Sequence, residues 1–260
     1  MPEAATGPGP ELRAKYDRDG YLILRGLLDR PQLQELREAV ETPLVQEQRR
    51  ANRRKEYAGL SIIHDIILLH PAFLKLARNP KLLEVIETLI GANIEIQHCK
   101  INWKPGEEGA GEVKWHQDFP YLPHTNYDLC AAFLVLDETN AENGCMRVIP
   151  GSHKLGQLKH TDKDGRTLPY VTDERFVEAD HEPVDLVLGP GDVSIHHVLT
   201  LHSSYPNRSQ NPRCAIIFEF RAADAMQIGG GFKKTTGILV HGSPSRTVRC
   251  DAGVVFVGAS

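Results

Sequence analysis

The stretch Trp115-His116-Gln117-Asp118 is the segment around which the rest of this chain is organised. Alternate residues of a β-strand project from the same face, so on a strand the side chains of His116 and Asp118 lie side by side. Two of the three ligands of a facial metal site can then come from one short piece of backbone. Alone, a His-X-Asp triplet is weak evidence, because exposed polar strands contain it by chance.

A candidate third ligand lies far downstream, in residues 191–209, which contain His196, His197 and His202. One imidazole from this run would complete a 2-His-1-carboxylate triad with three neighbouring positions left open, which is typical of non-haem Fe(II) oxygenases. Two oxygens of a 2-oxoacid and then O2 fit these open positions. Arg213 follows His202 by eleven residues and offers a fork-shaped partner for a carboxylate.

These motifs, with others between them, resemble the phytanoyl-CoA dioxygenase family, whose members are iron- and 2-oxoglutarate-dependent oxygenases. The resemblance rests on the segments 16–28, 116–118, 142–145, 150–154, 191–192, 202–204, 206–207 and position 213. Each segment is degenerate by itself, but together they follow the family's order over about 200 residues. The resemblance implies a mainly β fold with flanking helices, the double-stranded β-helix or jelly roll.

The resemblance also assigns the metal ligands. It implies that His116, Asp118 and His202 bind Fe(II), and that His197 occupies an accessory place, because the family carries a second histidine five residues before the distal ligand. Family position identifies His153 as structural. Halogenating relatives replace the carboxylate by a small residue, so Asp118 favours hydroxylation, while desaturation and cyclisation stay open.

The co-substrates that the resemblance implies are 2-oxoglutarate and O2, with succinate and CO2 released as an unactivated C–H bond is hydroxylated. Arg213 is the candidate partner for the far carboxylate of 2-oxoglutarate, and Ser204 adds a hydroxyl to the same group. In the family, a residue of an earlier strand also contacts 2-oxoglutarate. Within residues 97–104 the sequence does not fix which residue this is.

Composition limits the class of protein. The chain has 260 residues, of which 41% are hydrophobic and 25% are charged, as in an ordinary globular protein with a sizeable core. The net charge of −4 argues against a nucleic-acid surface. Five cysteines, an odd number without a CxxC pair, indicate free thiols in a reducing compartment. Without an apolar run of membrane-spanning length or a signal pattern, we expect no membrane partner and a cytoplasmic location.

The pattern predicts one jelly-roll domain over residues 11–260, after a flexible tail over 1–10. Within it, we expect a helical buttress over about 29–91 and a lid insertion over about 155–183. The expected helices are 11–17, one opening at Asp29, the helical turns 61–69 and 71–78, and 80–90 ended by Gly91. The expected strands are 21–24, 129–136, 146–149, 184–188, 193–197, 214–220, 237–241 and 254–257.

From Asn93 the chain alternates like a strand. Strict alternation places residues 94, 96, 98, 100 and 102 on one face, and residues 95, 97, 99, 101 and 103 on the other. One of these faces lines the barrel interior.

Two other functions use the same ligands: a cupin-like enzyme with Zn(II) or Mn(II), and a jelly roll that binds a 2-oxoacid without catalysis. The substrate is a small molecule, either a free metabolite or a CoA thioester whose phosphates would meet the basic cluster 49–55. The sequence leaves this choice and the oligomeric state open.

Overall fold

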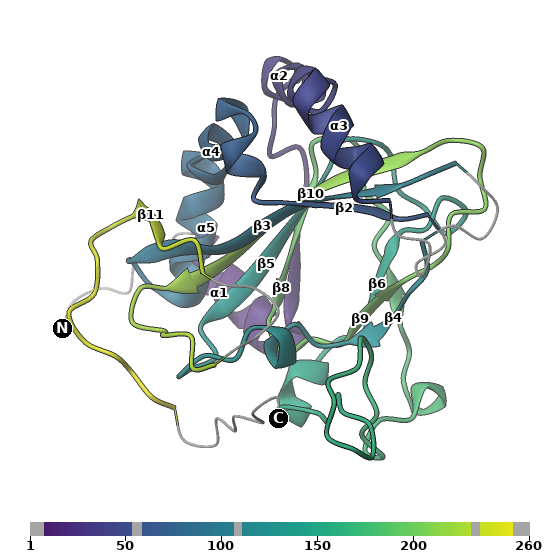
Figure 1. The fold of residues 1–260 in the computed structure, drawn as a ribbon. Coiled ribbons are helices and arrows are strands. Elements are labelled where there is room, and N and C mark those ends of the chain that lie inside the picture. The colour runs from purple at the N-terminus through teal and green to yellow at the C-terminus, as the bar shows by residue number, and fades with distance from the viewer. Residues whose placement is uncertain (1–7, 54–58, 107–110, 230–234, 252–260) are drawn as a thin grey trace.

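Two antiparallel sheets face each other in the computed structural model, which describes residues 8–53, 59–106, 111–229 and 235–251 (Figure 1). The predicted strand 254–257 and residues 1–7 of the predicted tail lie outside these ranges. The larger sheet has the strand order β1-β8-β5-β10-β3-β11, with β2 also paired to β3, and the smaller has the order β4-β9-β6-β7. The predicted jelly roll with flanking helices is confirmed.

The strands of the larger sheet are β1 (Tyr21–Leu24), β2 (Ser61–His64), β3 (Ile94–Lys104), β5 (Leu129–Val135), β8 (Val193–His197), β10 (Arg213–Ala222) and β11 (Ile238–His241). Those of the smaller sheet are β4 (Val113–His116), β6 (Met146–Val148), β7 (Val184–Asp185) and β9 (His202–Ser204). The inner faces meet through a small apolar cluster that includes Phe133, Met146 and Ile217.

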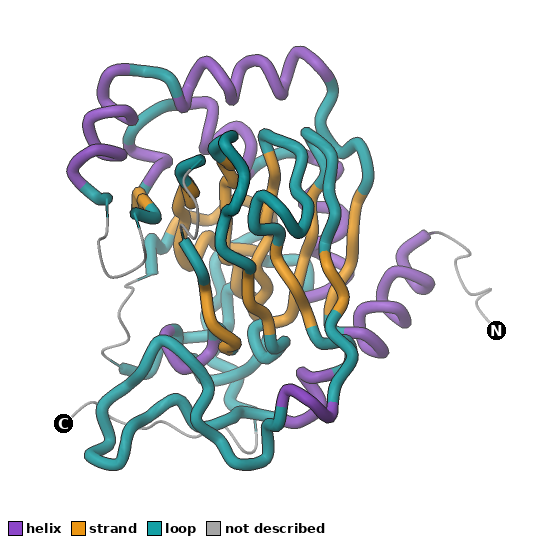
Figure 2. Tube along the Cα trace, turned by 90° about the vertical axis from the view of Figure 1, so that its right-hand side faces the viewer, coloured by secondary structure: helices purple, strands orange, loops and turns teal. Residues whose placement is uncertain are grey.

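Helices cover the outer face of the larger sheet (Figures 1 and 2). They are α1 (Pro8–Asp19), α2 (Arg30–Val40), α3 (Pro43–Ala51), α4 (Pro71–Ala77) and α5 (Pro80–Ile90). Helix α2 begins as predicted at Asp29, whose side chain accepts a hydrogen bond from the Gln32 amide in a capping box. The largest apolar core lies between these helices and the sheet, so the opposite face of the sheet is left for the site.

Two predictions about the helical segments were wrong. Helix α1 begins at Pro8, inside the predicted tail, because the first turn of a helix tolerates proline. Residues 61–64 form strand β2 and not a helical turn, since their backbone pairs with β3 from Ser61 opposite Trp103 onward. A short 3-10 helix, Ile66–Leu68, follows.

The strict alternation predicted for β3 was also wrong. Glu219 of β10 pairs with His98, but Phe220 pairs with Ile96, so Gln97 is an extra residue at a β-bulge. Before the bulge, Ile94 and Ile96 face the helical core; after it, Cys99, Ile101 and Trp103 do. The bulge therefore turns the even-numbered residues from position 98 onward toward the barrel interior.

The insertion 155–183 packs beside β4. Its apolar side chains, among them Leu158 and Phe176, contact Trp115 and Leu201. It supplies none of the described residues that line the cavity at the metal-ligand candidates. The insertion thus supports the strand that ends at His116, and its role as a lid stays a prediction.

None of the helices in the described ranges is long and apolar enough to cross a membrane. The five cysteines are free thiols, as predicted.

Candidate metal centre

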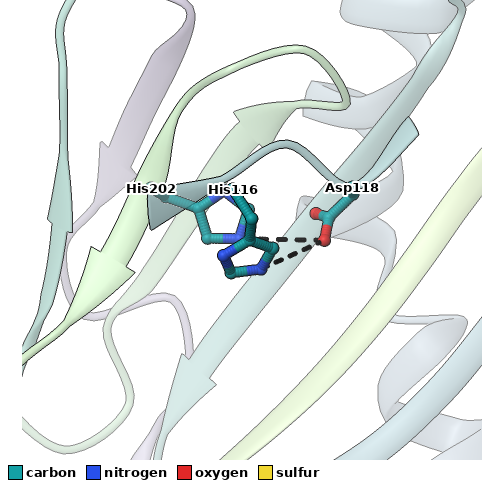
Figure 3. Close-up of side chains that lie close together, drawn as sticks. All are labelled: His116, Asp118 and His202. Carbon is teal, nitrogen blue, oxygen red and sulfur yellow. Dashed lines mark ion pairs between the residues drawn. The ribbon is translucent and has the colours of Figure 1, made fainter. Parts of the chain in front are cut away.

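His116, Asp118 and His202 come together between the two sheets (Figure 3). His116 ends β4 and His202 begins β9, and the two are direct partners across these antiparallel strands. Their Nε2 atoms lie 3.8 and 3.7 Å from Oδ1 of Asp118. One donor atom from each residue can be chosen so that all three lie within 4.8 Å of one another. The triad predicted from the sequence is assembled as a candidate metal site.

Asp118 reaches this place by a turn, not by the strand alternation we predicted. Strand β4 ends at His116, and Asp118 has helical backbone angles at the start of a 3-10 helix. Its amide donates to the carbonyl of Val198 at 3.1 Å. The residue between the ligands, Gln117, is buried, and its side-chain amide donates to the carbonyl of Leu199 at 2.8 Å. These bonds hold the turn that carries the carboxylate inward.

The histidine rings are oriented to present Nε2. Nδ1 of His116 lies 2.8 Å from the carbonyl oxygen of Lys114, and Nδ1 of His202 lies 3.0 Å from that of Thr200. A carbonyl only accepts, so each Nδ1 carries the proton and each Nε2 offers a lone pair. Burial lowers the pKa of both imidazoles. Both ligands are therefore neutral at pH 7, the form that binds a metal.

Asp118 stays ionised despite its burial. Burial raises the pKa of its carboxyl group, but a hydrogen bond from His196 and the positive charge of Lys100 outweigh this and hold the pKa well below its usual range. Nε2 of His196 lies 3.2 Å from Oδ2 of Asp118, and its ring centroid lies 4.4 Å from that of His202. The accessory histidine beside the triad is thus His196.

His197, which we predicted for this place, faces the other way. Its ring packs against Tyr16 and His153, with centroids 5.9 and 5.4 Å away, and its Nδ1 accepts from the amide of Leu199. Neighbouring residues of a strand point to opposite faces. Because His196 points toward the triad, His197 cannot.

Arg213 lies at the far end of the same cavity. It is 2% exposed, and its Nε and Nη1 atoms have no hydrogen-bond partner within the described part of the chain. Burial lowers its pKa to about 10, so the guanidinium is still charged at pH 7. A buried unpaired cation is costly, and a bidentate carboxylate is its best partner. The site thus fits the far carboxylate of a 2-oxoacid.

Lys104 is the residue of the 97–104 strand at this end, and the sequence alone did not single it out. It pairs with Arg213 across β3 and β10. Its Nζ donates to Ser204 Oγ at 2.8 Å, to the carbonyl of Gly144 at 3.2 Å and to that of Tyr205. Burial and the neighbouring Arg213 hold the pKa of Lys104 well below its usual range. Ser204, Lys104 and Arg213 thus form one polar cluster.

The cavity that joins the two clusters has a volume of about 70 Å³. Its wall also contains Lys100 and Glu219, which form an ion pair of 2.9 Å. Burial lowers the pKa of Lys100, but Glu219 and Asp118 outweigh this and raise it, so the amine is charged. This pair could not be predicted from the sequence, because the bulge at Gln97 decides that Lys100 faces inward.

The fold and the arrangement of these three candidate ligands are those of the jelly-roll metalloenzymes of the 2-His-1-carboxylate class. The family model described as phytanoyl-CoA dioxygenase (PhyH) matches residues 16–215, and the chain therefore belongs to this family. Its enzyme class is that of the dioxygenases that use Fe(II) and 2-oxoglutarate, as we predicted.

Two relatives and one solved structure illustrate the match. A probable alpha-ketoglutarate-dependent hypophosphite dioxygenase of Stutzerimonas stutzeri is 37% identical over 158 residues, which cover 60% of this chain and 54% of the relative. The L-proline trans-4-hydroxylase of Streptomyces griseoviridis is 26% identical over 236 residues, covering 84% and 88%. The non-haem alpha-ketoglutarate-dependent epimerase SnoN has a TM-score of 0.72 at 25% identity, covering 94% of this chain and 95% of SnoN. The chain thus spans about half the length of the first of these relatives and most of the other two.

Proposed function

We propose that this protein hydroxylates an unactivated C–H bond of a small organic metabolite, using Fe(II), 2-oxoglutarate and O2 and releasing succinate and CO2. His116, Asp118 and His202 hold the metal. The observation that carries the proposal is that three donor atoms within 4.8 Å share a cavity with the buried guanidinium of Arg213, whose Nε and Nη1 find no hydrogen-bond partner among the described residues. A 2-oxoacid dianion needs both a metal and a distant cation, and this cavity provides both kinds of group.

Each of these residues has a separate task. Bound Fe(II) supplies the redox chemistry that couples decarboxylation of 2-oxoglutarate to C–H oxidation. Arg213 binds the far carboxylate, and the hydroxyl of Ser204, which accepts from Lys104, donates its own proton to the same carboxylate. Lys104 is the residue of the 97–104 strand that we assign to 2-oxoglutarate binding, and it acts by holding the hydroxyl of Ser204 in place. Asp118 occupies the metal position that would otherwise admit a halide, which favours hydroxylation.

Related proteins support a small-molecule substrate: three of them are named for hypophosphite, L-proline and ectoine, and others for phytanoyl-CoA. The cytoplasm is the compartment we propose, because free thiols are typical of a reducing environment.

The test is anaerobic addition of Fe(II), then 2-oxoglutarate, to metal-free protein, with the visible charge-transfer band of a chelated 2-oxoacid as the readout. We expect the band in the wild type, its loss in His116→Ala and its weakening in Arg213→Ala. Arg208→Ala, which removes an exposed arginine, is the matched control and keeps the band. Bound Fe(II) without a band would overturn the 2-oxoglutarate assignment and favour a cupin-like Zn(II) or Mn(II) enzyme. A band without succinate formation in air, with any substrate, would favour the non-catalytic alternative.

A further inference from the structure

The ion pair of Lys100 and Glu219 lies on the cavity wall beside the candidate ligands. Lys100 is on β3 and Glu219 on β10, and both line the same cavity as His116 and Asp118. The side chain of Lys100 is 22% exposed and that of Glu219 6%. The pair therefore lies where a molecule entering the cavity would touch it.

Stability does not explain this pair. Two charges lose their hydration on burial, and a buried ion pair is often no more stabilising than apolar residues of similar volume. The same wall also contains apolar side chains, including Ala131, Phe133 and Ile217. Charged groups that converge with apolar side chains in one pocket are typical of ligand recognition.

Both members of the pair have unused bonding capacity. Nζ of Lys100 donates to Oε1 of Glu219, which uses one of its three N–H groups. Oε2 of Glu219 is buried and has no partner within the described part of the chain. The pair therefore still needs one hydrogen-bond donor at Glu219, and Lys100 can donate to an acceptor.

There is room for such groups next to the metal ligands. Ala131 of β5 lies between His196 and Glu219, which are its partners on the two neighbouring strands. Its methyl group is the smallest chiral side chain, so it leaves space between the imidazole that holds Asp118 and the carboxylate of Glu219. A substrate held by Glu219 would thus lie alongside the metal centre.

We propose that Lys100 and Glu219 bind the prime substrate, and that this substrate is a small zwitterion. Its protonated amine donates to Oε2 of Glu219, and its carboxylate accepts from Nζ of Lys100. This inference rests on the proposed function, since it assigns the substrate of the same site.

Charge balance selects a zwitterion over a simple anion. Lys100 and Glu219 sum to zero, so a substrate with no net charge enters without leaving an uncompensated charge. A hypophosphite ion has acceptor oxygens but no acidic hydrogen to donate, so it would leave Oε2 of Glu219 unpaired and place a second anion near it. L-Proline carries both groups, and the relative that is named for it matches most of the chain.

Substrate-dependent succinate formation tests this inference. The holoenzyme with Fe(II), 2-oxoglutarate and O2 is given either an equimolar mixture of ectoine and the protein amino acids other than aspartate, glutamate, lysine and arginine, or sodium hypophosphite. We expect the zwitterion mixture to stimulate succinate formation above the substrate-free rate, and hypophosphite not to do so. Lys100→Met and Glu219→Gln each raise the apparent KM for the stimulating compound by roughly tenfold or more, the effect of losing a charge-assisted hydrogen bond.

Controls separate this inference from the proposed function. Each variant keeps the charge-transfer band with 2-oxoglutarate, and the double variant Lys100→Met/Glu219→Met keeps the fold because no lone charge is buried. Lys81→Met, which removes an exposed lysine of α5, keeps the stimulation. An intact band with no zwitterion stimulation, with stimulation by hypophosphite, or with stimulation unchanged in both single variants would overturn the inference. Absence of the band in the wild type would instead overturn the proposed function.

Discussion

The imidazole of His196 holds the carboxylate oxygen of Asp118 that the two candidate metal ligands do not approach. His116 and His202 lie 3.8 and 3.7 Å from Oδ1, whereas Nε2 of His196 lies 3.2 Å from Oδ2. One oxygen is thus directed toward the metal position while the other accepts a hydrogen bond from the neighbouring sheet. Partners of this kind orient ligands and tune the metal.

Replacement of His196 by phenylalanine tests this relationship. We expect His196→Phe to weaken Fe(II) binding roughly 10–100-fold, because Asp118 loses the donor that fixes its orientation. His196→Gln, which keeps a donor, should weaken it less. The measurement is anaerobic titration of metal-free protein with Fe(II). Equal affinities in the wild type and both variants would contradict a positioning role for His196.

A substitution at Gly144 should disturb the end of the cavity proposed to bind 2-oxoglutarate, without replacing any residue that contacts the metal or 2-oxoglutarate. Its φ is +80°, and an added Cβ would lie 2.6 Å from the carbonyl oxygen of Tyr205 and 3.0 Å from Nζ of Lys104. Gly144→Ala must therefore displace Lys104 from Ser204. We expect the KM for 2-oxoglutarate to rise roughly tenfold, about the loss of one buried hydrogen bond, and the free energy of unfolding to fall by about 1–3 kcal/mol.

Gly165→Ala is the matched control for this prediction. Gly165 also has a positive φ, +81°, but no atom of the described residues lies within 4 Å of its added Cβ. It should lose about 1–2 kcal/mol of stability from the backbone conformation alone and keep the wild-type KM. A KM for Gly144→Ala that is no higher than that of Gly165→Ala would show that Lys104 does not support 2-oxoglutarate binding.

The sequence could predict the triad because motif order specifies the topology that joins β4 to β9. It could not predict how Asp118 reaches the site, since the turn after His116 depends on the carbonyl of Val198, far along the chain. The predicted strand alternation correctly placed Asp118 near His116, but in the structure a turn, and not a strand, brings Asp118 there.

The sequence could not predict which way a side chain points where that direction depends on an irregularity in the strand. The bulge at Gln97 decides that Lys100 and Lys104 face inward, and a bulge leaves no reliable pattern in a single strand. Similarly, the family spacing favoured His197, while the register of β8 against β5 selects His196. Long, regular segments such as the helix 80–90 were predicted to the residue because their caps are local.

Metal binding should stabilise the fold through the triad. Fe(II) at 100 times its dissociation constant adds about 2.7 kcal/mol, which for a chain of this size raises the melting temperature by roughly 5–10 °C. Anaerobic thermal unfolding with and without Fe(II) measures this shift. We expect no shift in His202→Gln and a full shift in His153→Gln, which alters a histidine outside the triad. A full shift in His202→Gln would place the metal elsewhere.

Buried neutral histidines should make the metal-free protein sensitive to acid. Burial lowers the pKa of His124 to about 4, of His160 to about 4 and of His197 to about 3. In the unfolded chain these groups titrate near pH 6.5. Their folded pKa values are depressed, so unfolding takes up protons below pH 6.5. The stabilisation that these neutral histidines provide is complete above pH 6.5, and it is lost as the pH falls toward their folded pKa values.

The contribution of His160 to this loss of stability in acid can be measured separately. Its Nδ1 lies 3.0 Å from the carbonyl of Leu158 and its Nε2 accepts from the amide of Gln117 at 3.0 Å, so protonation would break the second bond. Each such histidine contributes up to about 1.4 kcal/mol per pH unit between roughly pH 6 and 4.5. Urea unfolding of metal-free protein at several pH values in this window should show that His160→Gln has a shallower slope by about this amount, whatever its absolute stability. If the unfolding free energy of His160→Gln has the same slope against pH as that of the wild type, His160 already binds a proton in the folded state. The Gln117 amide would then not donate a hydrogen bond to this ring.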